Sequence, residues 1–199
     1  MIDQLISELV AYGLENGLID DADKVYVTNG LLELFQRQDY QEPEKLGKPR
    51  KLQLILDDLL EYALSQGILE DDTVTMRDLL DTKIMGILTP APSVVRKIFE
   101  EKYHVSPKAA TEFYYHFSQA TNYIRTDRII KDEKWETDTE FGKMDITINL
   151  SKPEKDPRDI AKAGVAKKSG YTACLLCREN EGYAGHFSHP ARQNHRIIP

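Results

Sequence analysis

Two stretches of this chain follow the same pattern fifty residues apart, and this repeat constrains the fold more than any other feature. Residues 8–21 carry apolar residues at helical spacing, then Gly17 and an acidic turn, and residues 58–71 repeat the arrangement around Gly67. Apolar residues three and four positions apart form one face of a helix, and a glycine commonly ends it. Two copies are too few for a solenoid, which needs about three repeats or more. The repeat therefore predicts a helical subdomain of two similar helix pairs.

Further helices are expected in the first 123 residues. Residues 2–16 have a helical apolar stripe, a short helix is expected near 22–26 and another from about Thr28, and Ser93 is placed to cap a helix that ends near Tyr103. Ser106 followed by Pro107 is a helix start signal for a segment that runs to about Tyr123. Five aromatic residues in that segment are assigned to the core: Phe113, Tyr114, Tyr115, Phe117 and Tyr123.

The pattern changes after Tyr123. Residues 134–137 and 144–150 are β-branched or alternating and predict two strands joined by a turn at 141–143, and residues 156–168 predict a helix. Residues 197–199 resemble the opening of an apolar strand, so we expect an N-terminal portion of a longer polypeptide. The fold class predicted is α+β, with a helical subdomain over 1–123 and the start of an α+β domain over 124–199.

The amino-acid composition limits which binding partners and which cellular compartment are expected. No apolar run approaches the roughly 20 residues of a membrane span, and the net charge of −7 disfavours nucleic-acid binding. The charge is uneven, because residues 161–199 carry six basic and two acidic residues on an otherwise acidic chain. A basic end suits a small anionic ligand, although a solvated charged face explains it equally well. The two cysteines and the absence of a signal peptide predict a cytoplasmic protein.

The residues from Tyr171 to the C-terminus hold the candidate metal ligands. Cys174 and Cys177 form a Cys-x-x-Cys pair, whose thiolates are able to bind one zinc ion. Candidates for the two remaining ligands are His186 with His189, or one of these with His195. Purely structural thiols are the main alternative. A thioredoxin-like redox pair is disfavoured, because no βαβ pattern surrounds the cysteines.

The same segment holds candidate phosphate ligands. Arg192, Asn194 and Arg196 are spaced so that one short loop presents two guanidinium groups and an amide. Guanidinium groups match phosphate oxygens in a bidentate geometry. The chain has no P-loop and no Gly-x-Gly-x-x-Gly motif, so nothing supports an NTPase or a Rossmann nucleotide site. A polar surface loop without a ligand is the alternative interpretation.

Residues 174–185, CLLCRENEGYAG, and residues 189–199, HPARQNHRIIP, resemble the signature of galactose-1-phosphate uridylyltransferases. The similarity is to the second sequence class, typical of Gram-positive bacteria, and it covers essentially the whole chain. It implies that UDP-glucose and galactose 1-phosphate exchange to give UDP-galactose and glucose 1-phosphate in galactose metabolism. The implied route is nucleophilic catalysis through a uridylylated histidine. The implied fold is a histidine-triad-like antiparallel sheet with helices, incomplete at the C-terminus of this chain.

The resemblance also implies roles for individual residues. The family's nucleophile lies in a His-x-His-x-Gln motif, which this chain lacks, so the catalytic residue is expected beyond Pro199 and none is assigned here. Arg192, Asn194 and Arg196 are expected to bind the nucleotide, and Cys174 and Cys177 correspond to the metal-binding pair of the family's first class. The implied partners are UDP-sugars and hexose 1-phosphates, with neither nucleic acid nor membrane, and a homodimer is one candidate assembly.

Two functions from other classes remain as alternatives at this point. The first is a small zinc-stabilised interaction module, in which the acidic helices bind a basic partner and the C-terminal segment is structural. The second is a thiol redox protein that uses Cys174 and Cys177, which unreactive cysteines would exclude.

Overall fold

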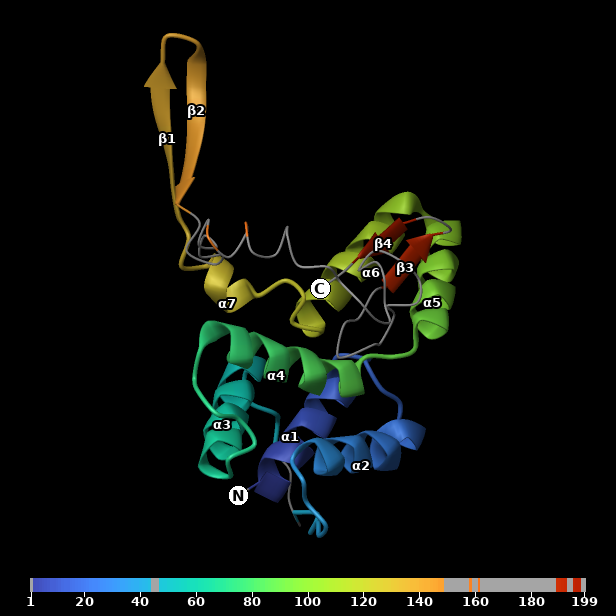
Figure 1. The fold of residues 1–199 in the computed structure, drawn as a ribbon. Coiled ribbons are helices and arrows are strands. Elements are labelled where there is room, and N and C mark those ends of the chain that lie inside the picture. Colours follow the sequence, from blue (N-terminus) through green and yellow to red (C-terminus); the bar gives the residue numbers. More distant parts are fainter. Residues whose placement is uncertain are drawn as a thin grey trace. The chain divides into compact units, whose positions relative to one another are not determined.

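A computed structural model describes residues 2–43, 47–148, 189–192 and 195–197, together with Arg158 and Ala161. The chain divides into two compact units, the first formed by residues 1–123 with 174–199 and the second by residues 124–173. Figure 1 shows the described elements along the chain. In order they are α1 (Ile2–Glu15), the 3₁₀ turn η1 (Asp21–Asp23), α2 (Lys24–Leu34), α3 (Leu52–Ser65), α4 (Val74–Leu88), α5 (Pro92–Val105), α6 (Pro107–Ala120), α7 (Thr126–Ile129), β1 (Glu133–Thr139), β2 (Gly142–Ile148), β3 (His189–Arg192) and β4 (His195–Ile197). The fold class is α+β, as predicted.

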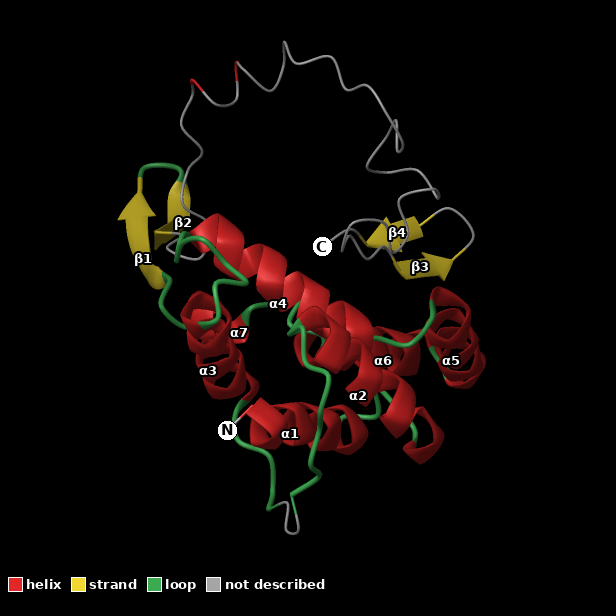
Figure 2. Cartoon of the chain, turned by 60° about the horizontal axis from the view of Figure 1, so that its bottom comes forward, coloured by secondary structure: helices red, strands yellow, loops and turns green. Residues whose placement is uncertain are grey.

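The first four helices of the helical unit, α1 to α4 (Figure 2), contribute their buried residues to one apolar core. Helix α1 contacts α2 and α3, and α4 contacts both α2 and α3. The equivalent helices of the two pairs therefore meet, α1 with α3 and α2 with α4, as in an isologous interface. Several of the side chains between them are fully buried: Ile6, Leu9, Leu31, Ile55, Leu59 and Ile84.

The two copies of the repeat end their helices in the same way. Gly17 and Gly67 have left-handed φ values of +64° and +67°. The N–H of Leu18 donates to the Gly13 carbonyl oxygen at 2.8 Å, and the N–H of Ile68 donates to the Ala63 carbonyl oxygen at 2.9 Å. Such bonds satisfy carbonyl groups that the helix end leaves without partners. The sequence repeat is thus a repeat of backbone geometry.

We expect Gly17→Ala and Gly67→Ala each to lower the free energy of unfolding by about 1 kcal/mol, because a Cβ atom makes a left-handed φ unfavourable. No neighbouring atom lies within 4 Å of the position that a Cβ would take at either site, so the cost is conformational rather than steric. Urea denaturation measures it. Gly47→Ala is the matched control, because Gly47 also has open space around it but no left-handed φ. An equal effect at all three sites would contradict the interpretation.

One arginine joins the two copies. The Arg50 Nε donates to a Glu8 carboxylate oxygen at 2.9 Å, and its Nη1 donates to an Asp58 carboxylate oxygen at 2.8 Å. Glu8 and Asp58 are equivalent positions of the repeat, one on α1 and the other on α3. The positive guanidinium group therefore bridges the two carboxylates and offsets the repulsion between them, which the pairing of α1 with α3 would otherwise cause.

The predicted helix start at Ser106 is confirmed, because its Oγ accepts a hydrogen bond from the Ala109 N–H at 3.0 Å. The aromatic assignment in α6 is right for three residues. Phe117 is buried, and Phe113 and Tyr114 pack against the core. It is wrong for Tyr115, which is 53% exposed, and for Tyr123, which lies beyond the end of α6 at Ala120 and is 42% exposed. Successive residues point about 100° apart around a helix, so neighbouring aromatic residues cannot all face one core.

Three other differences from the prediction concern a missing helix and two helix boundaries. Helix α4 was not predicted. The two helices expected near 22–26 and from Thr28 form one helix, α2, after the short turn η1. Helix α5 begins at Pro92 with Ala91 as its N-cap, two residues before the predicted cap Ser93, because proline is favourable at the first helical position.

The second unit contains the predicted β-hairpin. Strands β1 and β2 pair antiparallel, with Trp135 opposite Ile146 and Thr137 opposite Met144. At the turn, the Thr139 Oγ1 donates to the Gly142 carbonyl oxygen at 2.7 Å and accepts from the Phe141 N–H at 3.2 Å. Most of the helix predicted over 156–168 lies outside the described residues. Within that range the structure describes Arg158 and Ala161, and both are helical. Within the described ranges, no helix has the length and hydropathy that crossing a bilayer requires.

Candidate functional site

Two of the predicted phosphate ligands lie on a second, smaller hairpin. Arg192 is the last residue of β3 and Arg196 lies inside β4, and the two strands pair antiparallel. Arg192 is opposite His195, Arg196 is opposite Pro190, and the register shifts between Pro190 and Arg192. Neighbouring strands lie about 4.8 Å apart, so the backbones of the two arginine residues are close. The prediction of a short loop here was wrong in form, since a strand pair carries both residues.

The remaining predicted site residues are only partly within the described chain. Asn194, Cys174, Cys177 and His186 lie outside the described residues. His189 and His195 are at opposite ends of the β3–β4 hairpin, where His189 pairs with Ile197 and His195 with Arg192. The described part of the chain contains no group of three or more His, Cys, Asp or Glu residues able to hold a metal. The two cysteines therefore stay predicted metal ligands.

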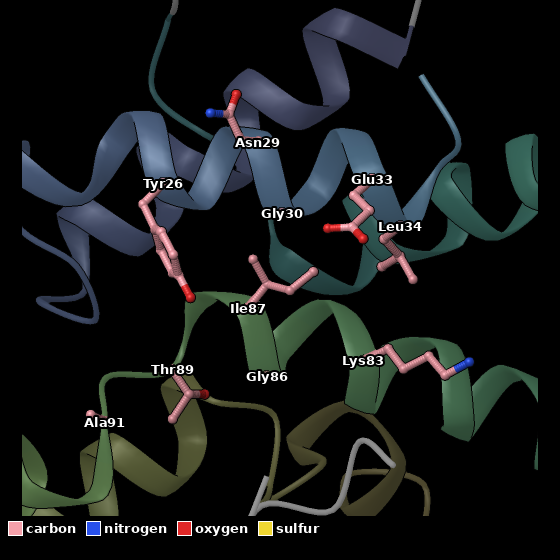
Figure 3. A pocket seen from close by; sticks show the side chains of 10 residues that line it. All are labelled: Tyr26, Asn29, Gly30, Glu33, Leu34, Lys83, Gly86, Ile87, Thr89 and Ala91. Carbon is pink, nitrogen blue, oxygen red and sulfur yellow. The ribbon is translucent and has the colours of Figure 1, made fainter. Parts of the chain in front are cut away.

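A groove between α2 and α4 is a concave feature that the sequence did not predict. It has a volume of about 810 Å³ and is lined by Tyr26, Asn29, Gly30, Glu33, Leu34, Lys83, Gly86, Ile87, Thr89 and Ala91. Figure 3 shows the Tyr26 ring and the Glu33 carboxylate projecting from α2 toward α4, while Ile87 projects from α4 toward Gly30. A Cβ atom at Gly30 would lie 3.0 Å from the Ile87 Cγ2. Glycine at this position therefore lets the two helices approach under the groove.

The groove is open rather than enclosed, and Tyr26 is 78% exposed. Ligand pockets usually bury most of a small molecule against apolar walls, with a few polar groups that converge on it. Lys83 points along the surface away from Tyr26 in Figure 3. The groove thus lacks the convergent polar groups of a substrate site, and the β3–β4 hairpin remains the candidate.

Residues 17–198 match the sequence family described as galactose-1-phosphate uridyl transferase, N-terminal domain. A galactose-1-phosphate uridylyltransferase of Clostridium acetobutylicum is 51% identical over 199 residues, which are 100% of this chain and 40% of that protein. The Butyrivibrio fibrisolvens protein of the same name is 50% identical over 100% of this chain and 51% of its own length. For the Bacillus subtilis protein of that name the identity is 46%, over 98% of this chain and 38% of the relative.

The chain thus spans about half or less of the length of the curated relatives it matches. No solved structure matches it. These similarities do not support the alternative of a small zinc-stabilised interaction module, because the likeness extends over the helices as well as the C-terminal segment. The chain belongs to the galactose-1-phosphate uridylyltransferase family.

Proposed function

We propose that this chain is the N-terminal part of a uridylyltransferase that converts UDP-glucose and galactose 1-phosphate to UDP-galactose and glucose 1-phosphate. The observation that carries the proposal is the identity of about half of all residues to proteins of that name, over the full length of this chain. The reaction runs through a uridylyl-histidine. The chain has no His-x-His-x-Gln motif, so we assign the nucleophile to none of its five histidines.

Within this proposal, the chain contributes binding of the nucleotide. Arg192 and Arg196 are on paired strands, and Asn194 lies between those strands in the sequence. A guanidinium group is always charged and donates several hydrogen bonds in one plane, which suits the oxygens of a diphosphate. Residues 161–199 have an excess of basic over acidic residues, while the rest of the chain is acidic. This segment is therefore favourable for an anionic ligand, which the rest of the surface would repel.

We expect Arg192→Ala and Arg196→Ala each to weaken UDP-glucose binding by about 1.5–3 kcal/mol, or roughly ten- to a hundredfold in Kd, because each removes a charged hydrogen bond to phosphate. The measurement is calorimetric titration of a full-length protein in which residues 1–199 are joined to the C-terminal remainder. Lys97→Ala on α5 is the control, since it also removes an exposed positive charge. Unchanged affinity in both arginine variants would rule out their assignment to the nucleotide.

Three further properties belong to the same proposal. Cys174 and Cys177 bind a zinc ion, the protein resides in the cytoplasm, and it assembles as a homodimer. The support for the first is the Cys-x-x-Cys spacing, and for the second the small number of cysteines, two in 199 residues. The third is supported only by the frequency of two-fold dimers among soluble oligomers.

A further inference from the structure

The β1–β2 hairpin has one apolar face and one polar face. Side chains alternate between the faces of a strand, and residues paired across two strands share a face. The hairpin apolar face consists of Trp135, Thr137, Met144, Ile146 and Ile148, and its two ends carry Glu133, opposite Ile148, and Thr139, opposite Gly142. The opposite face carries Lys134, Glu136, Asp138, Lys143 and Asp145. Apart from Glu133 at the end of the hairpin, this alternation is typical of a sheet that buries one side.

That apolar face is open to solvent. Trp135 is 45% exposed, Met144 is 50% exposed and Ile148 is 44% exposed. Among the described residues, the sheet has only these two strands, so the outer edge of each strand has no partner. A two-stranded hairpin is at best marginally stable in water unless something packs on it. We therefore expect another polypeptide segment to pack on this face.

The size of the face argues against a second copy of this chain as the cover. Each strand has seven residues and rises about 3.3 Å per residue, and the strand pair is roughly 10 Å wide. The area of the hairpin apolar face is therefore on the order of 230 Å². Stable complexes of separate proteins bury about 800 Å² on each partner. A patch this small suffices only when a covalent connection holds the two surfaces at a high effective concentration.

The relatives contain such a connected segment. This chain matches the family's N-terminal domain, and 49–62% of each relative's length lies outside the match, since the match covers 51% and 38% of the Butyrivibrio fibrisolvens and Bacillus subtilis proteins. We propose that the hairpin apolar face docks against the C-terminal remainder of the full-length polypeptide and closes the sheet onto it. This inference rests on family membership and on the hairpin, and it does not require that uridylyl transfer be the reaction.

Trp135 is the only tryptophan of the chain and reports directly on this face. We would incorporate 5-fluorotryptophan into the 199-residue chain and into a fusion of residues 1–199 with the C-terminal remainder of the Clostridium acetobutylicum relative. Trp135→Phe identifies its ¹⁹F resonance in the fusion. The relaxation that a soluble gadolinium chelate induces is expected to fall about ninefold from the chain to the fusion, the ratio between the 45% exposure of Trp135 and the roughly 5% exposure of a core residue.

A pair of matched variants tests the face itself. Met144→Lys places a charge on the hairpin apolar face, and Thr147→Lys places the same charge three residues away, on the polar face of the same strand. In the fusion, Met144→Lys is expected to lower Tm and to restore the accessibility of Trp135, while Thr147→Lys does neither. In the 199-residue chain, the two variants are expected to have the same Tm.

Three results would overturn the proposal. Trp135 that is equally accessible in the chain and in the fusion would show that the C-terminal remainder does not cover the face. Trp135 that is already protected in the chain at every concentration would show that another part of the same chain covers it. Protection of the chain that grows with protein concentration and disappears in Met144→Lys would identify a second copy as the partner.

Discussion

Phe35→Ala is expected to lower the free energy of unfolding by about 3–5 kcal/mol, the usual cost of removing a fully buried aromatic ring. Phe35 follows the last residue of α2 and is 1% exposed. Its ring meets the ring of Tyr62 edge to face, with centroids 6.0 Å apart and an angle of 74° between the planes. Tyr62 belongs to α3, so this contact joins the first helix pair to the second. The variant therefore removes both buried area and the aromatic contact between the pairs.

Urea denaturation of the purified chain measures this effect. The matched control is Val25→Ala, because Val25 lies on α2, the helix that ends just before Phe35, and is 71% exposed. Its effect is expected within about 0.5 kcal/mol of zero. Phe35→Leu keeps most of the apolar volume, so its cost should lie between the two. The m-value is expected to stay constant, since the folded state keeps its compactness. If Phe35→Ala and Val25→Ala cost the same, the two helix pairs do not share one core.

The elements that the sequence predicted have strong local signals. Helix α6 has Ser106 and Pro107 at its start, and α1 and α3 each have a single apolar stripe that ends at a glycine with a left-handed φ. The hairpin alternates and has a glycine at its turn. In each case the physical cause lies within a few residues, so a single sequence suffices.

Helix α4 was missed because its pattern depends on distant partners. Leu80, Ile84 and Leu88 form one buried row, yet Asp81 and Met85 beside them are buried as well. The helix contacts α2 on one side and α3 on another, so its buried residues cover a broad arc instead of one stripe. The cap is present, since the Thr73 Oγ1 accepts from the Met76 N–H at 3.3 Å, but a threonine alone is a weak signal.

The backbone that carries Arg192 and Arg196 was not predicted, and their role in binding stays a prediction. Arginine and asparagine close together indicate an anion site by their chemistry, whatever the backbone does. Strands β3 and β4 have four and three residues, β3 contains Pro190, and their pairing includes a register shift, so the sequence shows no alternating pattern that would predict them. The groove between α2 and α4 depends on the close approach of Gly30 to Ile87, a contact between residues far apart in the sequence. Such contacts leave no local pattern.

Alkaline pH is expected to destabilise the helical unit through two tyrosines. The Tyr12 hydroxyl donates to the Ala120 carbonyl oxygen at 2.9 Å and so joins α1 to α6. Burial, with a smaller contribution from the Glu15 carboxylate, raises the pKa of Tyr12 to about 12. Burial also raises the pKa of Tyr114, and the neighbouring Tyr123 adds to this. In both cases the folded state favours the neutral phenol, while a tyrosine in the unfolded chain titrates near pH 10.

The direction of the effect follows from proton binding. Above about pH 10 the unfolded chain releases the two phenolic protons that the folded state still holds, so the stability they contribute is complete below pH 10 and is lost as the pH rises through 12. With allowance for the partial solvent exposure of both side chains, we expect a loss of about 3 kcal/mol at pH 12. Urea denaturation at pH 9 and at pH 12 measures it. The double variant Tyr12→Phe with Tyr114→Phe is expected to lose about 3 kcal/mol less than the wild type over this interval, because phenylalanine has no proton to release. Tyr26→Phe, at an exposed tyrosine, should leave the loss unchanged, and an equally large loss in the double variant would assign the alkaline transition to other groups.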